Sequence, residues 1–251
     1  MIAPIAIYGA TGFTGTLVAR ALLAEGASVI LAGRDQPRVD ALAATLRGEL
    51  GAGDAGIQAR SASLADPASI RAALAGAAVV VDCAGPFARL GEPVVDAAIA
   101  AGICYLDTAG EQSFLRDMYQ RKDAPARHAG IAVVNGMAFE IALGDWAAAL
   151  AATALAGDDD GELDEVVVAY GLHRMRPTRG TRLSALEALG EPGVMWHSGR
   201  WDPVRPAAER RTFNFGASSG GREAVSFPSG EVISVPRHVA TRRVQTFVSL
   251  S

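Results

Sequence analysis

The chain has 251 residues, of which 50% are hydrophobic and 20% charged, and its formal net charge is −4. These values are typical of a globular protein with a substantial core, and they exclude the disordered, fibrous and disulfide-rich classes. The slightly negative charge gives no electrostatic basis for a nucleic-acid partner.

Residues 2 to 156 alternate short β-branched runs with Ala-rich helical stretches. This pattern predicts an α/β fold, namely a Rossmann doubly wound parallel sheet with helices on both faces. The expected strands are 5–8, 28–32, 57–61, 78–83, 104–107 and 132–135, and the expected helices are 17–24, 39–50, 68–75, 93–101, 114–121 and 142–154. Asp66-Pro67 predicts a cap and a first-turn proline for the helix that follows.

The acidic turn Asp158 to Gly161 marks the expected domain boundary. It separates a nucleotide-binding domain, residues 1–156, from a second, smaller α+β domain, residues 157–251, for substrate binding or dimerisation. The strands expected there are 165–172, 212–215, 224–226, 232–235 and 244–250, with one short helix over 183–189.

No apolar stretch reaches the roughly 18 residues of a spanning helix, so no membrane span is expected. The first strand begins at residue 5, which leaves no room for a secretory leader. Cys83 and Cys104 follow apolar segments, as buried structural thiols often do. Together these features predict a cytoplasmic protein.

A glycine-rich turn stands directly between the first strand and the first helix. In such a turn the backbone approaches a pyrophosphate closely, and the amides at the helix N-terminus face its negative charge. Because a glycine turn alone is weak evidence, the strand-turn-helix context carries the prediction. The expected cofactor-binding residues are Gly9, Ala10, Thr11, Gly12, Phe13, Thr14 and Gly15.

Gly33 and Arg34 occupy the end of the second strand, where an NAD site would carry an acidic residue for the ribose 2′-hydroxyl. A guanidinium can pair with a 2′-phosphate instead, so the site is expected to prefer NADP(H) over NAD(H). The neighbouring Asp35 weakens this inference. The alternative is that Arg34 is a solvated charge at a strand end.

A further glycine turn follows the fourth strand, at the edge of the sheet where open α/β folds bind ligands. It is expected to flank the nicotinamide half of the cofactor. Its residues are Cys83, Ala84, Gly85, Pro86 and Phe87, preceded by Asp82.

The catalytic group is left open. A Tyr with a Lys four residues later, as in short-chain dehydrogenases, is absent from the sequence. Weak candidates are Asp107, Thr108 and Glu111, which follow the fifth strand, and His173, which lies in a basic stretch. Capping of the next helix is the alternative role for the first three. No metal site is predicted.

The ordered set of these motifs resembles the saccharopine dehydrogenase-like oxidoreductases, a family that includes trans-acting enoyl reductases. The set comprises residues 9–15, 32–34, 82–87 and 104–111. The resemblance implies an NADPH-dependent oxidoreductase that transfers hydride to the C=C bond of an enoyl thioester or to a C=N bond. It also implies a small-molecule or carrier-bound thioester substrate.

Relatives in this family usually continue beyond the point where this chain stops, so a truncated second domain with an incomplete active site is one expectation. A non-catalytic NADP-sensing protein is the alternative function, and a degenerate domain that binds nothing is a third. Exposed strands of the second domain could pair across a two-fold axis, which predicts a homodimer.

Overall fold

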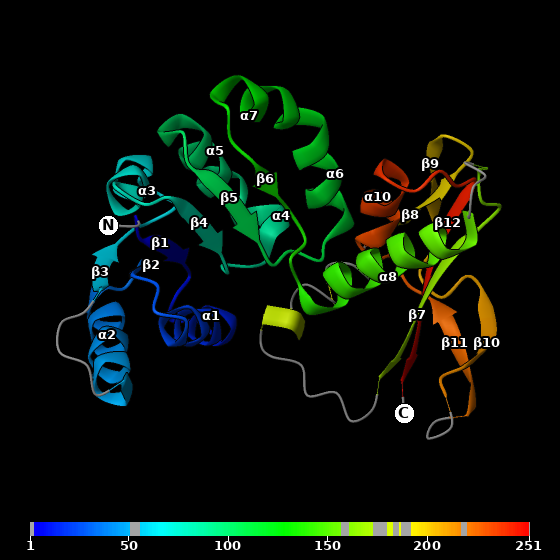
Figure 1. Ribbon diagram of the computed structural model, residues 1–251, viewed down its shortest axis with the longest axis horizontal. Helices are drawn as coiled ribbons and strands as arrows, with labels where there is room; N and C mark the ends of the chain where they lie inside the picture. The colour runs from blue at the N-terminus through cyan, green and yellow to red at the C-terminus, as the bar shows by residue number, and fades with distance from the viewer. Residues whose placement is uncertain are drawn as a thin grey trace. The chain divides into compact units, whose positions relative to one another are not determined.

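The computed structural model describes residues 3–50, 56–156, 161–172, 180–182, 186, 192–216 and 220–250. Contacts within the chain define two compact units (Figure 1). Unit 1 comprises Met1–Ala109 and Asp117–Met137, and unit 2 comprises Gly110–Arg116 and Ala138–Ser251. The sequence-based boundary after residue 156 therefore differs from this division, because helix α8 (Phe139–Ala156) groups with unit 2.

Unit 1 is built on a six-stranded parallel sheet in the order β3-β2-β1-β4-β5-β6, which confirms the predicted Rossmann fold. Its strands are β1 (Ile5–Tyr8), β2 (Val29–Gly33), β3 (Ile57–Ser61), β4 (Val79–Asp82), β5 (Cys104–Asp107) and β6 (Val133–Val134). The strand order reverses between β1 and β4. Open α/β sheets bind their ligands at this point, at the edge formed by the carboxyl ends of the strands.

The helices of unit 1 cover both faces of this sheet (Figure 1). They are α1 (Phe13–Ala24), α2 (Gln36–Leu50), α3 (Pro67–Leu74), α4 (Phe87–Leu90), α5 (Glu92–Ala101), the last part of α6 (Gln112–Arg121) and α7 (Asp123–Ala129). Helices α1 and α2 bury Ala19, Leu23 and Leu46 in one core with Ile7 and Leu31 of the sheet. The predicted cap of α3 is confirmed, since the carboxylate of Asp66 accepts from the Ala68 amide at 3.0 Å.

Unit 2 combines a mixed sheet with a few helices, which confirms the predicted α+β class. The sheet runs β10-β11-β12-β8-β9, and β7 pairs with β12 in parallel. Helix α8 packs through Ala148 on a core with Val166 and Val244. The elements are β7 (Val166–Leu172), β8 (Gly193–His197), β9 (Arg200–Val204), β10 (Arg210–Asn214), β11 (Gly221–Ser226), α10 (Glu231–Ser234), η1 (Val235–Arg237) and β12 (Arg243–Leu250).

The predicted strand over 232–235 is wrong, because Glu231–Ser234 forms α10 and Val235 begins η1. The β-branched run suggested a strand. Val232, Ile233 and Val235 are instead buried in the core of unit 2, so packing overrides strand propensity here. The hairpin β8–β9 was not predicted, and most of the expected helix 183–189 lies outside the described residues.

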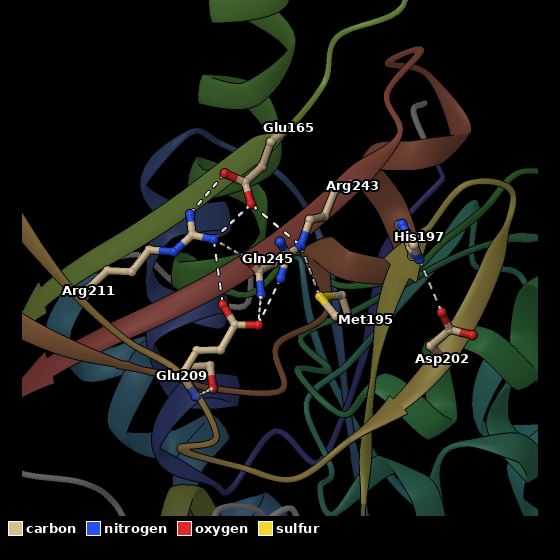
Figure 2. Close-up of polar contacts among 9 residues, drawn as sticks. Glu165, Met195, His197, Asp202, Glu209, Arg211, Arg243 and Gln245 are labelled. Atoms are coloured by element: carbon tan, nitrogen blue, oxygen red, sulfur yellow. Dashed lines mark hydrogen bonds and ion pairs between the residues drawn. The ribbon is translucent and has the colours of Figure 1, made fainter.

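A network of compensating charges ties together three strands of unit 2 that are distant in sequence (Figure 2). Arg211 of β10 donates to Glu165, which precedes β7, at 2.9 and 3.1 Å, and to Gln245 of β12 at 2.7 Å. Arg243 of β12 donates to Glu209 at 2.8 Å. Two arginines and two glutamates neutralise one another, so the network holds the sheet together without presenting a net charge to a ligand.

Among the described residues, no helix is both long enough and apolar enough to cross a membrane.

Gln112, the first residue of α6, acts as an internal clamp of unit 2. Its side chain is buried, and its amide nitrogen donates to the carbonyls of Val194 at 3.0 Å and Ser229 at 2.8 Å. Its amide oxygen accepts from the Val194 amide at 2.9 Å. One side chain thus satisfies three backbone groups, from β8 and from the loop before α10.

We expect Gln112→Leu to lower the free energy of unfolding by roughly 2 to 4 kcal/mol, because buried backbone groups would lose their partners. Urea denaturation followed by circular dichroism measures the change. The matched control is Gln120→Leu, at an exposed position of the same helix, which should change stability by less than about 0.5 kcal/mol. Equal stability of the two variants would contradict the clamp.

Candidate functional site

The glycine turn between β1 and α1 is packed so tightly that two of its glycines, Gly9 and Gly15, leave no room for a Cβ atom. A Cβ on Gly15 would lie 2.8 Å from the Cα of Ala10 and closer still to the carbonyl oxygen of Gly9. Gly9 has a φ of +76°, and a Cβ there would lie 3.0 Å from the amide nitrogen of Ala84. The turn is therefore a backbone cradle that stays narrow only because these positions are glycines.

The N-terminus of α1 faces this cradle without a side-chain cap. Gly12 is the N-cap residue and makes no side-chain hydrogen bond to the first turn. The Thr16 hydroxyl donates to the Ala10 carbonyl at 3.1 Å and fixes the turn against the helix. Uncapped amides and the helix dipole suit a pyrophosphate. The cofactor-binding role of Phe13, Thr14 and Gly15 stays a prediction.

The end of β2 lies beside the cradle. The amides of Gly9 and Ala10 both donate to the Ala32 carbonyl, at 3.0 and 3.1 Å. Arg34 follows and is exposed, and its positive charge lowers the pKa of Tyr8, although burial outweighs this effect and raises that pKa to about 12. No ion pair of Arg34 is found within the described residues, so its guanidinium can face a 2′-phosphate.

Asp35, which weakened the prediction for Arg34, has a structural role. Its carboxylate accepts from the Arg38 amide at 3.2 Å, at the start of α2. An acidic side chain in this position caps the helix and is turned to the backbone. The Asp35 carboxylate is therefore occupied by the helix and is not required as a partner of the ribose 2′-hydroxyl.

The second predicted loop, residues 83–87, lies against the same cradle. The Cys83 amide donates to the Tyr8 carbonyl at 2.9 Å, and the Ala84 amide donates to the Asp82 carboxylate at 2.9 Å. Burial raises the pKa of the Cys83 thiol to about 12, which makes a nucleophilic thiolate unfavourable at neutral pH. Residues 9–15, 33–34 and 83–87 thus meet at the carboxyl edge of the sheet, as the sequence predicted.

Asp107, one of the weak catalytic candidates, is fully buried and bonded to the backbone. One carboxylate oxygen accepts from the amides of Ala109 at 3.0 Å and Gly136 at 2.8 Å, and the other accepts from the Asn135 side chain at 2.5 Å. Its carbonyl accepts from the Met137 amide at 2.8 Å. Ala109 and Met137 are the residues at which the chain leaves unit 1, so Asp107 anchors both connections.

The other catalytic candidates have different surroundings. The Thr108 amide donates to the Asp82 carbonyl at 3.3 Å. The Thr108 side chain lowers the pKa of the Cys83 thiol, although burial outweighs this effect. Glu111 is partly buried, and its carboxylate accepts from the Gly110 amide at 3.1 Å. His173 lies outside the described residues.

Asp82 and Asp107 end neighbouring strands in the same register, and both are buried. The Tyr105 hydroxyl donates to the Asp82 carboxylate at 3.3 Å. Burial raises the pKa of both acids, and that of Asp82 is held well above its usual value, helped by the nearby charge of Asp107. Asp107 accepts more N–H bonds, so Asp82 is the member of the pair that retains a proton more readily.

Lys122, which follows Tyr119 by three residues, is engaged by two acidic side chains. Its ammonium group lies 2.8 Å from Glu92 and 2.5 Å from Asp96 of α5. The ion pairs join the junction between α6 and α7 to α5 and give the lysine a structural role. Within the described residues, no cluster of three His, Cys, Asp or Glu side chains could hold a metal ion.

Sequence reasoning missed a buried polar cluster in unit 2. Glu231 is fully buried, accepts hydrogen bonds from the hydroxyls of Ser229 and Tyr170, and lies under Gly144 of α8. A Cβ on Gly144 would lie 2.6 Å from a carboxylate oxygen of Glu231. A glycine inside an otherwise Ala-rich helix, together with a glutamate in an apolar run, was the available signal.

A model of the saccharopine dehydrogenase NADP-binding domain matches residues 5–134. A Mycobacterium tuberculosis protein whose name assigns it provisionally to the trans-acting enoyl reductases is 36% identical over 187 residues, which cover 74% of this chain and 44% of that protein. A lipid droplet localized protein of Caenorhabditis elegans is 29% identical over 54% of this chain and 33% of its own length. The chain thus spans less than half the length of these relatives.

Among solved structures, a short-chain dehydrogenase of Sphingobium yanoikuyae in complex with NADPH is 21% identical. The match covers 53% of this chain and 70% of that chain, with a TM-score of 0.38.

We expect Glu231 to make stability depend on pH. Burial raises its pKa from 4.5 to about 7, with Glu140 adding repulsion, so the folded protein binds this proton more tightly than the unfolded chain. The stabilisation that protonated Glu231 gives the folded state is complete below about pH 4.5 and is lost as the pH rises through about 7. The loss is on the order of 3 kcal/mol.

Glu231→Gln stays neutral and should therefore lack this decline, which urea unfolding at pH 5, 6, 7 and 8 would measure. Glu223→Gln, at an exposed glutamate paired with Arg210, serves as the control and should follow the wild-type profile. Parallel profiles for wild type and Glu231→Gln would show that Glu231 is not the titrating group.

Proposed function

This chain belongs to the saccharopine dehydrogenase NADP-binding domain family and its cofactor is NADP(H), and from this premise we propose that it is an NADPH-dependent reductase of enoyl thioesters. When bound, NADPH supplies the hydride. The C=C bond of a carrier-bound thioester is the preferred target, and a C=N bond is the second choice. Because the chain spans 44% of the first relative, the activity itself is part of the proposal.

The observation that carries the proposal is the narrow cradle formed by Gly9, Gly15 and Ala84 at the start of α1. It suits the pyrophosphate, while exposed Arg34 at the end of β2 suits the 2′-phosphate. The loop 83–87 lies against the cradle and would flank the nicotinamide. The enoyl thioester is favoured over an imine because two relatives, which cover 74% and 48% of this chain, carry names that include trans-acting enoyl reductase.

In this proposal Asp107 does not transfer a proton but holds the backbone at Ala109 and Gly136 in place. Both of its carboxylate oxygens already accept hydrogen bonds, from Ala109, Gly136 and Asn135. We do not assign the role of proton donor to the substrate to Thr108, Glu111 or His173. A cytoplasmic location stays a prediction.

A non-catalytic NADP-sensing protein is the second candidate function. The engagement of Asp107 with backbone amides favours it, because this acid is then unavailable for chemistry. Binding of NADPH without turnover of any substrate would support this candidate.

We expect Arg34→Asp to weaken NADPH binding by about 10- to 100-fold and NADH binding by less than about threefold, because the variant repels only the 2′-phosphate. Isothermal titration calorimetry with both nucleotides measures the two affinities. Arg71→Asp, at an exposed position of α3, makes the same charge change elsewhere and should leave both affinities unaltered. Equal losses for the two nucleotides would exclude a 2′-phosphate role for Arg34.

The reaction is tested with a panel of 2-enoyl thioesters on coenzyme A and on a phosphopantetheinylated carrier, beside a panel of cyclic imines. We expect NADPH-dependent gain of two hydrogens in an enoyl thioester, detected by mass spectrometry, with deuterium transferred from labelled NADPH. Gly15→Ala should abolish turnover, since the added methyl group closes the cradle. If only imines are reduced, a C=N bond would replace the enoyl thioester as the proposed substrate. Tight NADPH binding with no product from either panel would favour the NADP-sensing protein.

A further inference from the structure

Three polar side chains are buried together in unit 1, at the carboxyl ends of two neighbouring strands. Asp82 ends β4, and Tyr105 and Asp107 belong to β5. Each of the three is 0% exposed. Asp82 pairs directly with Asp107, and side chains alternate along a strand, so Tyr105, two residues before Asp107, lies on the same face of the sheet. We call these three residues the carboxyl-edge triad.

The hydroxyl of Tyr105 lies between the two acids. It donates to the Asp82 carboxylate at 3.3 Å. Burial raises the pKa of both acids, and the Tyr105 side chain partly offsets this for Asp82 and for Asp107. A phenylalanine would fill the same space in the core without a polar atom, so the contribution of the hydroxyl is confined to these interactions.

Each acid of the carboxyl-edge triad holds a different backbone segment. Asp82 accepts from the Ala84 amide at 2.9 Å. Asp107 accepts from the amides of Ala109 at 3.0 Å and Gly136 at 2.8 Å. The triad therefore joins the loop after β4 to the segments that follow β5 and β6, and all of these residues belong to unit 1.

Ala84 is also the residue at which the loop after β4 meets the glycine cradle. A Cβ on Gly9 would lie 3.0 Å from both the amide nitrogen and the Cβ of Ala84. The neighbouring Cys83 amide donates to the Tyr8 carbonyl at 2.9 Å. The position of Ala84 thus determines where residues 83–87 stand beside the cradle.

The two acids differ in the donors around them, and this difference assigns the proton of the pair. Two carboxylates buried side by side cannot both be charged at low cost. Asp107 faces three N–H donors, which favour its charged form. Asp82 faces one, the Ala84 amide, and a neutral carboxyl group can still accept from it. The proton therefore belongs to Asp82.

We propose that Tyr105 is a positioning residue for the nicotinamide half of NADP(H), because its hydroxyl, between a neutral Asp82 and a charged Asp107, fixes the loop 83–87. In the proposed function, on which this inference rests, that loop flanks the nicotinamide. Tyr105 is fully buried and does not touch the cofactor, so it acts through Asp82 and Ala84. Arg34 follows β2, on the other side of β1 from β4, so the 2′-phosphate half is independent of the triad.

Two ligands separate the halves of the cofactor. NADPH carries both, whereas adenosine 2′,5′-bisphosphate lacks the nicotinamide half. We expect Tyr105→Phe to weaken NADPH binding about 5- to 10-fold, as for the loss of one hydrogen bond, and to change bisphosphate binding by less than about twofold. Isothermal titration calorimetry measures both affinities. The matched control is Tyr119→Phe in α6, which makes the same change elsewhere in unit 1 and should leave both affinities unaltered.

Two variants of Asp82 test where the proton lies. Asp82→Asn is always neutral and still offers an oxygen to the Ala84 amide, so it should keep the wild-type ratio of the two affinities. Asp82→Ala leaves that amide without its partner and should lose NADPH affinity at least as strongly as Tyr105→Phe. Circular dichroism and thermal melting verify that each variant is folded at the temperature of the titration.

Three results would overturn the proposal. One is an equal change, or no change, in the two affinities of Tyr105→Phe, which would leave the hydroxyl a role in stability alone. Another is the same loss in Asp82→Asn and Asp82→Ala. The third is a wild type that binds NADPH no more tightly than the bisphosphate, which would also remove the nicotinamide from the loop 83–87.

The affinity ratio is measured without turnover and is therefore separate from the test of the reaction. Absence of product from both substrate panels would contradict the proposed reductase. The contrast between NADPH and the bisphosphate in Tyr105→Phe would still decide the role of Tyr105.

Discussion

The close approach of three backbone segments at the carboxyl edge of the sheet is the constraint on which the rest of the cofactor site depends. Gly9 approaches both Ala84 and Gly15 so closely that a methyl group on either glycine would displace backbone. This contact fixes α1 against the turn and brings the loop after β4 to the same place. The amides that face a pyrophosphate are thus set by packing, before any ligand binds.

Two buried carboxylates fix the segments that follow the neighbouring strands β4, β5 and β6. Asp82 holds the loop after β4 through the Ala84 amide, and Asp107 holds the segments that leave β5 and β6. Each is costly to bury, and each is stabilised by N–H donors, which low local dielectric makes strong. Both acids therefore serve the architecture of the site, and in the proposed function Asp107 keeps this structural role.

The sequence was sufficient for the nucleotide-binding half because its signals are local. A strand, a glycine turn and a helix follow one another within residues 5–24, and Arg34 stands at the end of the next strand. Unit 2 was predicted less well, because its sheet pairs β7 with β12 across about eighty residues. In addition, Val232 and Ile233 lie in the buried helix α10, although their sequence suggested a strand. The Glu231 cluster likewise depends on contacts among α8, β7 and α10 that no local pattern specifies.

The anchoring by Asp107 also bears on how such a chain can vary during evolution. The connections after β5 and β6 meet on one carboxylate, so a change in the length of either connection would remove its own hydrogen bond to Asp107. At the opposite edge of the sheet, the turns at Gly26 and Gly76 have no neighbouring atom within 4 Å of an added side chain. Insertions and deletions should therefore accumulate at that edge, while the spacing from residue 107 to 109 and from 135 to 137 stays constant.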